Sequence, residues 1–458
     1  MKTPHHTDIP RATALKVLNR LNAEIHPHLD QLMTELVDES GLPFSHRDRR
    51  FINTLIYGVM RWRGRLDDII RHYSRTPFDK IHPEIQNILR LGLYQIFFLD
   101  RVPDSAAVNT SVELAKQTAP DWIVKYVNGL LRNAVRKGLP PFPAPDQNPV
   151  AALCAAKSFP PWLIQRWLAR FGRSACEALC DAANAIPPLT LRCNTLKMDR
   201  QRLMDALGPE VESVSPARHA PDGIRITNPQ KPLHALSAFQ NGGFQVQDEA
   251  AQLATRLLSP GRHETILDAC AGLGGKTGYI SQLMGNTGRI IAADRDADKL
   301  KALKTAVERL GVFNVRPEAH DFTKPPKNWT GPLVDRVFLD APCSGLGVIR
   351  RNPDIKWDAG RKNLLRFQQK QIRLLDCLAD LVRPGGMIVY AVCSFEPEEN
   401  ENVVDSFLAD HRHFQTEPAD LAFLPDPGFF WDKRGFFRTF PHVHDMDGFF
   451  AAILRRAT

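Results

Sequence analysis

Long uncharged apolar runs are absent from this chain of 458 residues. A transmembrane helix needs about 20 consecutive apolar residues, so no membrane span is expected. The first six residues, Met1–His6, also lack the apolar core typical of a secretory signal peptide. The sequence therefore predicts neither a membrane anchor nor a secretory leader.

Cysteine is scarce, with eight residues in the whole chain. Disulfide-stapled domains are small and far richer in cysteine, so these residues are expected to be reduced thiols in a cytoplasmic protein. Cys176 and Cys180 share a predicted helix, but no further ligand follows at a spacing that suits a metal. Core packing explains this pair better, and no metal site is expected. The histidine pairs are interpreted in the same way, as surface or core residues: His26/His28, His411/His413 and His442/His444.

The length of the chain is too great for one ordinary hydrophobic core, so two or three domains are expected. A hydrophobic content of 43% with 24% charged residues indicates globular domains. The formal net charge of +8 is compatible with a polyanionic partner such as ribosomal RNA, other RNA or DNA. It is also compatible with a basic surface that serves only solubility.

Apolar residues recur at helical spacing from about residue 8 to residue 138. The predicted helices are Arg11–Leu21, Phe51–Val59, Ile85–Ile96, Ser105–Thr118 and Trp122–Lys137. Basic residues cluster in the same region: Arg47, Arg49, Arg50, Arg61, Arg63, Arg65, Arg132, Arg136 and Lys137. The charge leaves two interpretations open, a helical bundle with solvated basic faces and a helical RNA-binding module.

A proline-rich stretch, Leu139–Pro149, predicts an extended, semi-rigid linker. The next part, to about residue 240, is predicted to be a small α+β unit. Its elements are a helix at Pro161–Phe171, a strand at Leu189–Asn194 and a helix at Arg200–Leu207.

From about residue 241, strands alternate with helices. The predicted strands are Thr265–Ala269, Arg289–Asp294, Val315–Asp321, Asp335–Asp340, Met387–Val392, Gly435–Phe440 and Phe449–Leu454. Helices are predicted at Thr277–Met284, Asp296–Leu310 and Lys362–Val382. This alternation favours a parallel sheet with helices on both faces.

Four acidic residues close or follow successive strands of that sheet: Asp268, Asp294, Asp321 and Asp340. They converge on the carboxyl edge, where open α/β sheets bind ligands. After the first strand comes a turn whose Gly272, Gly274 and Gly275 allow a ligand to approach the backbone. Asp294 is placed to hold the ribose hydroxyls of a nucleoside ligand.

The kind of ligand follows from what the turn lacks. A P-loop requires glycine at the position of Cys270, and the full glycine spacing of a dinucleotide-binding turn is missing. S-adenosylmethionine fits better, because it needs a ribose-binding acid and open backbone rather than a phosphate cradle. The alternative is an α/β domain that binds no ligand.

Two thiols fall at neighbouring strand ends. The strand Arg336–Leu339 leads to Asp340 and Cys343, where proline and glycine residues prevent it from continuing. Cys393 ends the fifth strand, next to the fourth in a doubly wound sheet. Each cysteine alone would most often be a core residue. Together with Asp340 they indicate a catalytic pocket, and the first hypothesis makes Cys343 the nucleophile.

Such a set suits methyl transfer to C5 of a pyrimidine. A thiolate that adds to C6 makes C5 enamine-like, so that C5 can attack the methyl group of the cofactor. Asp340 is the candidate acid near N3, and to donate a proton it needs an environment that raises its pKa. The target base must leave its stack to reach the pocket.

Motifs from about residue 235 onward resemble, in order and spacing, those of the RNA cytosine-C5 methyltransferases of the Nol1/Nop2/Sun type. The matching segments are Val246–Ala251, Asp268–Thr277, Asp340–Gly347, Val348–Trp357, Cys393–Ser394 and Asp447–Phe450. The first 138 residues resemble the helical RNA-binding domain of the NusB family, through Leu89–Gln95, Val102–Pro103, Ala106–Asn109 and Tyr126–Arg132. The whole chain is therefore similar to the Sun/RsmB branch, bacterial methyltransferases of small-subunit ribosomal RNA.

The resemblance implies that Cys393, rather than Cys343, is the catalytic nucleophile, and that Cys343 assists release of the methylated product. Asp340 remains the catalytic acid. The implied S-adenosylmethionine site consists of Cys270, Ala271, Gly272, Leu273, Gly274, Gly275, Lys276, Asp294, Asp321 and Asp340. The resemblance also places Arg192 and Asn194 in a small subdomain that helps to hold RNA.

Two positions depart from the family pattern. Gly272-Leu273 stands where Ala-Pro is common, which bears on fine cofactor geometry. Val392 stands where threonine usually precedes the nucleophile; the missing hydroxyl alters local hydrogen bonding but need not abolish attack. The basic residues from Arg350 to Lys356 and from Arg361 to Arg373 are expected to position phosphates, against the alternative of a solvated helix face.

We therefore expect a multidomain protein. Its parts are an all-α, NusB-like RNA-binding domain at 5–138, a proline-rich linker at 139–149, a small α+β subdomain at 150–240 and an α/β, Rossmann-like S-adenosylmethionine-dependent methyltransferase domain at 241–458. The expected activity is methylation of C5 of a cytosine in 16S ribosomal RNA through a cysteine–C6 adduct. The alternatives are a C5 methyltransferase of tRNA or large-subunit RNA, and a non-catalytic RNA-binding assembly factor. The expected partner is 16S RNA or an assembling small ribosomal subunit, bound by a monomer without metal or membrane.

Overall fold

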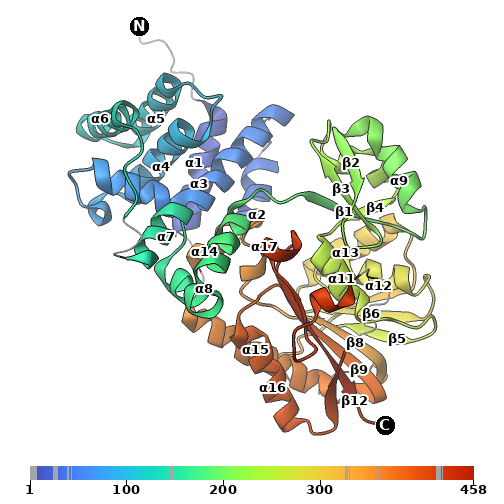
Figure 1. Ribbon diagram of the computed structural model, residues 1–458. Helices are drawn as coiled ribbons and strands as arrows, with labels where there is room; N and C mark the ends of the chain where they lie inside the picture. Colours follow the sequence, from blue (N-terminus) through green and yellow to red (C-terminus); the bar gives the residue numbers. More distant parts are fainter. Residues whose placement is uncertain are drawn as a thin grey trace. The chain divides into compact units, whose positions relative to one another are not determined.

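The computed structural model describes residues 8–23, 29–38, 41–42, 44–143, 148–324, 329, 331–358, 360–418, 424 and 426–458 (Figure 1). The chain divides into two compact units, Met1–Asn184 with Asn352–Asp358, and Ala185–Arg351 with Ala359–Thr458. The first unit thus includes a short segment that interrupts the second unit in the sequence. The pair His26/His28 and the middle of the predicted linker, residues 144–147, lie outside the described residues.

The described elements of the first unit are all helical, as the sequence predicted for residues 8–138; residues 150–184, which the sequence assigned to the α+β subdomain, also belong to this unit. Its elements are α1 (Ile9–Ala23), α2 (Leu29–Met33), the π-helical turn η1 (Thr34–Asp38), α3 (His46–Tyr73), the 3₁₀ turn η2 (Phe78–Lys80), α4 (Pro83–Phe98), α5 (Asp104–Thr118), α6 (Asp121–Lys137), α7 (Pro149–Lys157), α8 (Pro161–Asn184) and α14 (Ile355–Asp358). Leu55, Ile88 and Leu131 are fully buried at the centre of its core.

The helix α3 is much longer than the predicted Phe51–Val59. Its start is fixed by a capping box: the Ser45 hydroxyl accepts from the Asp48 N–H, and the Asp48 carboxylate accepts from the Ser45 N–H. Later turns of α3 carry Arg61 and Arg65 into the interior, where both are buried. The predicted basic cluster is therefore not one continuous face, because part of it lies inside the unit.

The second unit begins with a small antiparallel sheet in the order β2-β3-β1-β4. Its elements are β1 (Leu189–Cys193), α9 (Arg200–Leu207), η3 (Gly208–Glu210), β2 (Ser213–Pro216), β3 (Gly223–Thr227), η4 (Leu233–Ala235), α10 (Ser237–Gln240) and β4 (Phe244–Val246). The sequence predicted only β1 and α9. The other strands were missed because they have three to five residues and stand among prolines and glycines.

The main sheet has the order β10-β12-β9-β8-β5-β6-β7, and β11 pairs with β12. Its strands are β5 (Thr265–Asp268), β6 (Arg289–Asp294), β7 (Val315–Ala319), β8 (Val334–Asp340), β9 (Val382–Val392), β10 (Phe414–Glu417), β11 (Phe437–Thr439) and β12 (Phe449–Arg456). The neighbours from β7 to β9 are parallel, as predicted.

The prediction of a wholly parallel sheet is wrong at the other edge. The strand β12 runs antiparallel to β9, and β10 runs antiparallel to β12. The helix that precedes β12, α17 (Pro441–His444), has only four residues. Since a crossover between parallel strands needs a dozen or more residues, the short connection from β11 to β12 gives an antiparallel pair.

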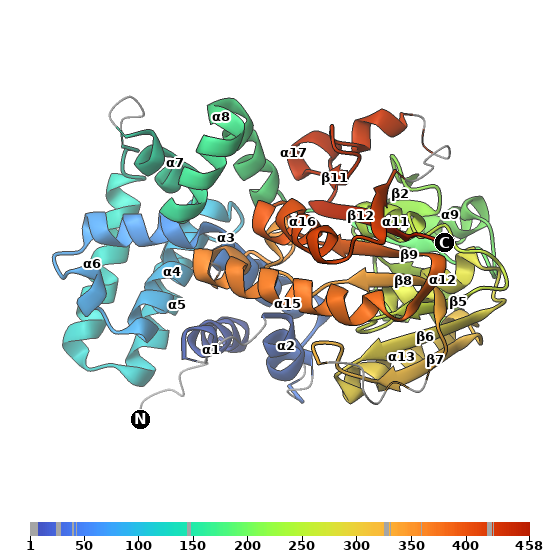
Figure 2. The same cartoon turned by 90° about the horizontal axis from the view of Figure 1, so that it is seen from below.

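Helices cover both faces of the main sheet (Figures 1 and 2). On one face lie α11 (Glu249–Arg256), α12 (Gly275–Leu283) and α13 (Ala297–Leu310); on the other lie α15 (Arg361–Ala379) and α16 (Glu401–Asp410). Three further turns, η5 (Leu346–Val348), η6 (Pro397–Glu399) and η7 (Pro427–Phe430), stand in the connections. Among the described residues, every helix is too short or too polar to cross a membrane.

Candidate active site

The turn between β5 and α12 lies at the carboxyl edge of the sheet. Gly272 and Gly274 have φ angles of 54° and 82°, in the left-handed region that favours glycine. A Cβ on Gly272 would meet no heavy atom within 4 Å, whereas one on Gly274 would lie 2.7 Å from Cγ of Leu303. The turn therefore packs against α13 at Gly274 and leaves open space beside Gly272. The Leu273 side chain is exposed.

The acid at the end of β6 is tied directly to this turn. The Gly272 N–H donates to Oδ2 of Asp294 over 3.0 Å. The other oxygen of Asp294 accepts from the Asp296 N–H. Asp321 lies beyond the end of β7, where its carboxylate accepts from the N–H and hydroxyl of Thr323. Asp268, Asp294 and Asp340 all lie close enough to Cys270 for their charges to act on its thiol, whereas β7 ends before Asp321.

Asp268, at the end of β5, is fully buried. Burial raises its pKa to about 7, although the Thr277 hydroxyl, which donates to Oδ2 over 2.6 Å, acts in the opposite direction. Oδ1 of Asp268 has no hydrogen-bond partner among the described groups. A buried carboxyl oxygen without a hydrogen-bond partner is uncommon. It indicates that Asp268 either carries a proton or faces a ligand at this end of the sheet.

Lys276 joins the turn to the strand that carries the cysteine loop. Its Nζ lies 2.5 Å from Oδ2 of Asp340, and its side chain is mostly buried. Burial alone would lower the pKa of Lys276, but the carboxylate of Asp340 raises it above its usual range, with a smaller contribution from Cys393. The ammonium group is therefore close to both Asp340 and Cys393.

The two predicted thiols lie together. Sγ of Cys343 is 3.2 Å from Sγ of Cys393. The loops that carry them are held by two backbone hydrogen bonds, from the Ala341 N–H to the Ala391 carbonyl and from the Gly347 N–H to the Cys393 carbonyl, both 2.9 Å long. Adjacent pairing of β8 with β9 thus brings together cysteines that are fifty positions apart in the sequence.

The environment distinguishes the thiols. The hydrogen bond with Cys393, and then burial, raise the pKa of Cys343 well above its ordinary value. Negative charge on Glu399 and Asp340 acts in the same direction. Burial also raises the pKa of Cys270, with Asp294 as the next cause, so Cys270 is a neutral thiol beside the turn.

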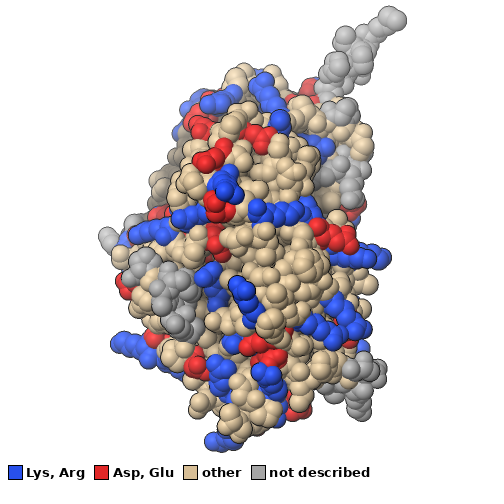
Figure 3. Space-filling model, turned by 90° about the vertical axis from the view of Figure 1, so that its right-hand side faces the viewer, with Lys and Arg blue, Asp and Glu red and all other residues tan. Residues whose placement is uncertain are grey.

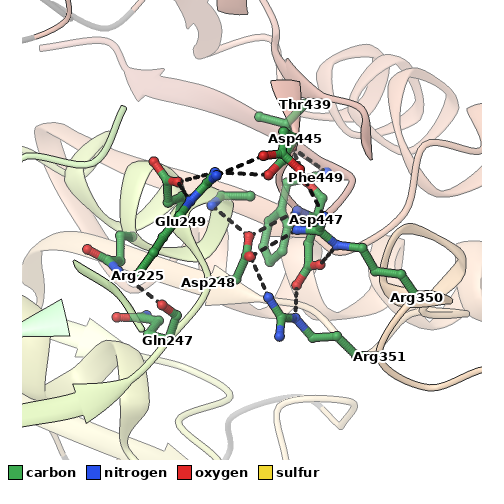
Figure 4. A network of polar contacts seen from close by, with 12 residues as sticks. Arg225, Gln247, Asp248, Glu249, Arg350, Arg351, Thr439, Asp445, Asp447 and Phe449 are labelled. Carbon is green, nitrogen blue, oxygen red and sulfur yellow. Dashed lines mark hydrogen bonds and ion pairs between the residues drawn. The ribbon is translucent and has the colours of Figure 1, made fainter. Parts of the chain in front are cut away.

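Two arginines expected to hold phosphate are instead bound to carboxylates (Figure 4). Arg350 donates to Asp447 over 2.7 Å and to Asp248 over 3.2 Å. Arg351 donates to the same two carboxylates over 2.7 and 2.6 Å. Arg350 is 3% exposed, so the prediction of phosphate positioning is wrong for it. This cluster fixes the segment after the Cys343 loop to the start of β12.

Lys356, at the end of the same basic stretch, belongs to the first unit and is completely buried. Its Nζ donates to the Arg61 carbonyl over 2.6 Å and to Oδ1 of Asn184 over 3.1 Å. The ring of Phe159 lies 4.1 Å away. The prediction of phosphate binding is therefore wrong for Lys356 as well. The side chain of Arg361 lies outside what the structure describes.

Arg192 and Asn194 are also buried, at 1% and 3% exposure. Arg192 donates to the Gly275 carbonyl at the start of α12 over 2.6 Å, and Asn194 donates to the carbonyls of Gly242 and Leu310 over 2.8 Å. These contacts join the small sheet to the main one. The resemblance places both residues in a subdomain that helps to hold RNA, and their burial means that neither side chain itself reaches RNA.

Metal-ligating groups do not gather anywhere in the described part of the chain: no cluster of three or more His, Cys, Asp or Glu side chains could hold an ion. All eight cysteines are free thiols. Cys176 and Cys180 are buried in α8, which agrees with core packing. The groups at the carboxyl edge are a glycine turn, carboxylates, Lys276 and the thiols of Cys270, Cys343 and Cys393.

An alternating sheet with this turn and these strand-end acids defines the Rossmann-like methyltransferase class. Three segments match family models: residues 255–455 match the 16S rRNA methyltransferase RsmB/F, residues 8–136 match the NusB family, and residues 159–232 match the RsmF/B-like ferredoxin-like domain. The chain is 38% identical over 415 residues to the probable ribosomal RNA small subunit methyltransferase B of Synechocystis sp., covering 91% of this chain and 93% of the relative. It is 33% identical to the corresponding protein of Bacillus subtilis, covering 97% and 98%.

The chain belongs to the ribosomal RNA small subunit methyltransferase B family, and the predicted resemblance is confirmed. Among solved structures, a methyltransferase homologue from Pyrococcus horikoshii is 27% identical, with a TM-score of 0.58 over 68% of this chain and 99% of that one. NSun6 from Pyrococcus horikoshii with SFG is 23% identical, with a TM-score of 0.58 over 66% and 99%. The second likeness shows the fold alone.

Proposed function

We propose that this chain transfers a methyl group from S-adenosylmethionine to C5 of a cytosine in small-subunit (16S) ribosomal RNA. The observation that carries the proposal is the pair of thiols 3.2 Å apart beside the Lys276–Asp340 ion pair. Membership of an rRNA methyltransferase family supplies the substrate class. C5 of a pyrimidine is a weak nucleophile. A thiol that adds to C6 makes C5 nucleophilic enough to take the methyl group.

The residues at the carboxyl edge fit the cofactor. The space beside Gly272 admits a ligand close to the backbone, and Asp294 stands where ribose hydroxyls are bound in such sheets. Asp321 and the remaining residues of the turn, from Cys270 to Lys276, complete the proposed site. When bound there, S-adenosylmethionine supplies an electrophilic methyl group.

Electrostatics favours Cys393 as the nucleophile. The Lys276 ammonium favours a negative charge on Cys393, whereas Glu399 and Asp340 oppose one on Cys343. Two thiolates 3.2 Å apart would repel, so attack by a Cys393 thiolate requires Cys343 to stay a neutral thiol.

The steps then use residues of this chain. The Cys393 thiolate forms a bond to C6, and the electron pair of the C5–C6 double bond moves toward N3, which takes a proton from the Lys276–Asp340 pair. In that pair the proton originates on the Lys276 ammonium and passes to N3 through Asp340. C5 then acquires the methyl group, N3 returns its proton to the Lys276–Asp340 pair, and the C5 proton passes to water. The C6–S bond breaks and returns the thiolate, and Cys343 assists this release.

RNA contact beyond the pocket is proposed for the first unit, from the exposed basic ends of two of its helices. Arg47 and Arg50 lie near the start of α3, and Arg132, Arg136 and Lys137 lie near the end of α6. The face of the molecule in Figure 3 shows Lys and Arg scattered among Asp, Glu and uncharged areas. Among its described residues that face has no continuous basic patch, so the proposal rests on the helix ends alone. We further propose that the chain acts as a cytoplasmic monomer on 16S RNA or an assembling small subunit.

The nucleophile is tested by two alanine variants. Cys393→Ala is expected to abolish methylation and covalent RNA adducts, whereas Cys343→Ala is expected to accumulate adducts. Denaturing gels with labelled RNA measure both. Adducts that survive in Cys393→Ala and vanish in Cys343→Ala would reverse the assignment.

The substrate is tested by bisulfite sequencing of RNA from cells that lack or re-express the chain. A single cytosine of 16S RNA is expected to lose and regain methylation. If methylation changes only in tRNA or large-subunit RNA, the chain is a C5 methyltransferase of that RNA instead. Absence of S-adenosylmethionine binding by calorimetry would favour the non-catalytic assembly factor.

A further inference from the structure

Glu399 is a buried carboxylate behind the two cysteine loops. It ends η6 and is 0% exposed. Its Oε1 accepts from the Ser344 N–H over 2.7 Å, and its Oε2 accepts from the Ser344 hydroxyl over 2.5 Å. Oε2 also accepts from the Ser394 hydroxyl over 2.6 Å. Ser344 and Ser394 each follow a cysteine of the thiol pair, so one carboxylate bridges both loops.

The bridge is anchored to the sheet and to a covering helix. Gln371 of α15 donates to Oε1 of Glu399 over 3.3 Å and to the Pro342 carbonyl over 3.0 Å. The Tyr390 hydroxyl, from β9, donates to the Glu399 carbonyl over 2.6 Å. Helix, strand and both loops thus meet at Glu399, and none of the reaction steps above makes use of it.

Every side-chain contact of Glu399 comes from a donor, which is the arrangement that holds a carboxylate rather than a neutral acid. Burial raises the pKa of Glu399, and hydrogen bonds from Ser344, Ser394 and Gln371 act against that rise. No ion pair within the described residues involves Glu399. Its negative charge is therefore uncompensated by a cation, and Cys343 is among the groups that feel it.

We propose that Glu399 is a positioning residue that sets the spacing of the two thiols and disfavours a thiolate at Cys343, which leaves the role of nucleophile to Cys393. The use of this difference between the two thiols in catalysis rests on the proposed function. Its two structural parts, spacing and charge, can be measured without RNA or cofactor.

Other charged and titratable groups around Cys343 must be kept constant in such a measurement. Asp340, from β8, and Cys393, after β9, act on Cys343 directly. Lys276, from α12, pairs with Asp340, and Tyr390, from β9, lies close enough to sense the charge of Cys343. The experiment therefore starts from Cys393→Ala, which removes the neighbouring thiol and leaves the rest in place.

In that background, the rate of alkylation of Cys343 by iodoacetamide is measured against pH by peptide mass spectrometry. Adding Glu399→Gln is expected to move the profile to lower pH, so that Cys343 reacts about tenfold faster at a fixed pH below its midpoint, the factor that corresponds to one pKa unit. Glu398→Gln, which removes a charge from the neighbouring position, is the matched control and should move the profile much less.

A purely structural role would give a different pattern. Ser394→Ala removes a donor to Glu399 and keeps the charge, so it is expected not to move the profile to lower pH. Equal shifts in Ser394→Ala and Glu399→Gln would mean that loosening of the loop exposes Cys343, and the charge part of the proposal would be wrong. No shift in Glu399→Gln, with a melting curve that shows a folded protein, would also overturn it.

The spacing is tested without any change at Glu399. In the otherwise unaltered chain, the diamide-driven disulfide between Cys343 and Cys393 is followed by mass spectrometry. Ser344→Ala and Ser394→Ala are expected to slow it severalfold, and Glu398→Gln is not. Equal rates in all variants would overturn the positioning role. Because neither measurement uses RNA, either result is independent of whether the proposed methylation occurs.

Discussion

The Nζ of Lys276 lies 2.5 Å from Oδ2 of Asp340, and this ion pair connects the glycine turn to the strand that leads to Cys343. The side chains are 17% and 30% exposed, so water screens the pair only in part. Lys276 is thus placed to serve two neighbours, the acid proposed for N3 and the thiol proposed for C6. Its position in the glycine turn would couple the proposed cofactor site to both.

Lys276→Met is expected to lower methylation by at least about a hundredfold, the usual contribution of a positioned proton donor. It is also expected to destabilise the chain by about 1–3 kcal/mol, because Asp340 keeps its charge and loses its partner. The double change Lys276→Met/Asp340→Asn should recover stability but not activity. Single-turnover methylation and thermal melting measure the two effects.

The control for this prediction is Lys301→Met. Lys301 is an exposed lysine of α13 that pairs with Asp298 one turn away. Its loss should change neither melting nor methylation. If the double variant regained activity together with stability, Lys276 would be a structural partner of Asp340 and not a proton donor.

The carboxyl edge could be predicted because its signals are local. A strand is recognised from consecutive apolar residues, and the next polar residue marks its end, as with Asp294 and Asp340. The parallel order of the central strands then placed Cys343 beside Cys393. Their assignment as assistant and nucleophile came from the family resemblance, because spacing alone had favoured Cys343.

The roles of the basic stretch could not be predicted, because partners distant in sequence decide them. The local sequence around Arg350 does not reveal whether its partner is a phosphate or a carboxylate. Its partners Asp248 and Asp447 lie about a hundred positions away on either side in the sequence. Lys356 likewise looks like a surface lysine, and only the fold shows that it enters the other unit. A run of charges fixes the sign of the potential but not the identity of the partner.

Asp268→Asn is expected to stabilise the cofactor-free protein at alkaline pH. The folded-state pKa of Asp268, about 7, lies above the ordinary value of 3.8, so the folded chain retains a proton that the unfolded chain has lost. Stability contributed by this group is complete below about pH 4 and is lost as pH rises through 7. The variant should therefore melt like the parent at about pH 3.5, below the unfolded pKa, and be more stable by roughly 2–4 kcal/mol at pH 8.5.

Chemical denaturation at the two pH values measures this difference. Asp298→Asn is the control, since Asp298 is an exposed carboxylate at the start of α13. Equal stability of Asp268→Asn and the parent at pH 8.5 would show that Asp268 does not hold a proton in the folded state.

Arg350→Met is expected to destabilise the second unit by about 3 kcal/mol or more, because Asp447 and Asp248 would remain buried with fewer cationic partners. Arg202→Met, at an exposed arginine that pairs with Asp199, should have little effect. Thermal melting compares them. If phosphate contact were the main role of Arg350, its variant would instead melt normally and bind RNA more weakly.

Lys356→Met is expected to flatten the pH dependence of stability of the first unit. Burial lowers the pKa of Lys356 well below its ordinary value, so above that lowered pKa the unfolded chain binds a proton that the folded chain does not. Stability of the parent should then rise with pH until the unfolded lysine also loses its proton near pH 10, by up to about 1.4 kcal/mol per pH unit. The variant lacks this titration, although it also loses the hydrogen bonds to Arg61 and Asn184.

The measurement is hydrogen exchange of α3 and α8 between pH 6 and pH 9, corrected for intrinsic exchange. Lys116→Met is the matched control in the same unit, because Lys116 is exposed and pairs only with its neighbour Glu113. The difference in opening free energy between parent and Lys356→Met should grow with pH, while the control runs parallel to the parent. Parallel profiles for both variants would mean that Lys356 keeps its charge inside the fold, held by the two oxygens and the ring of Phe159.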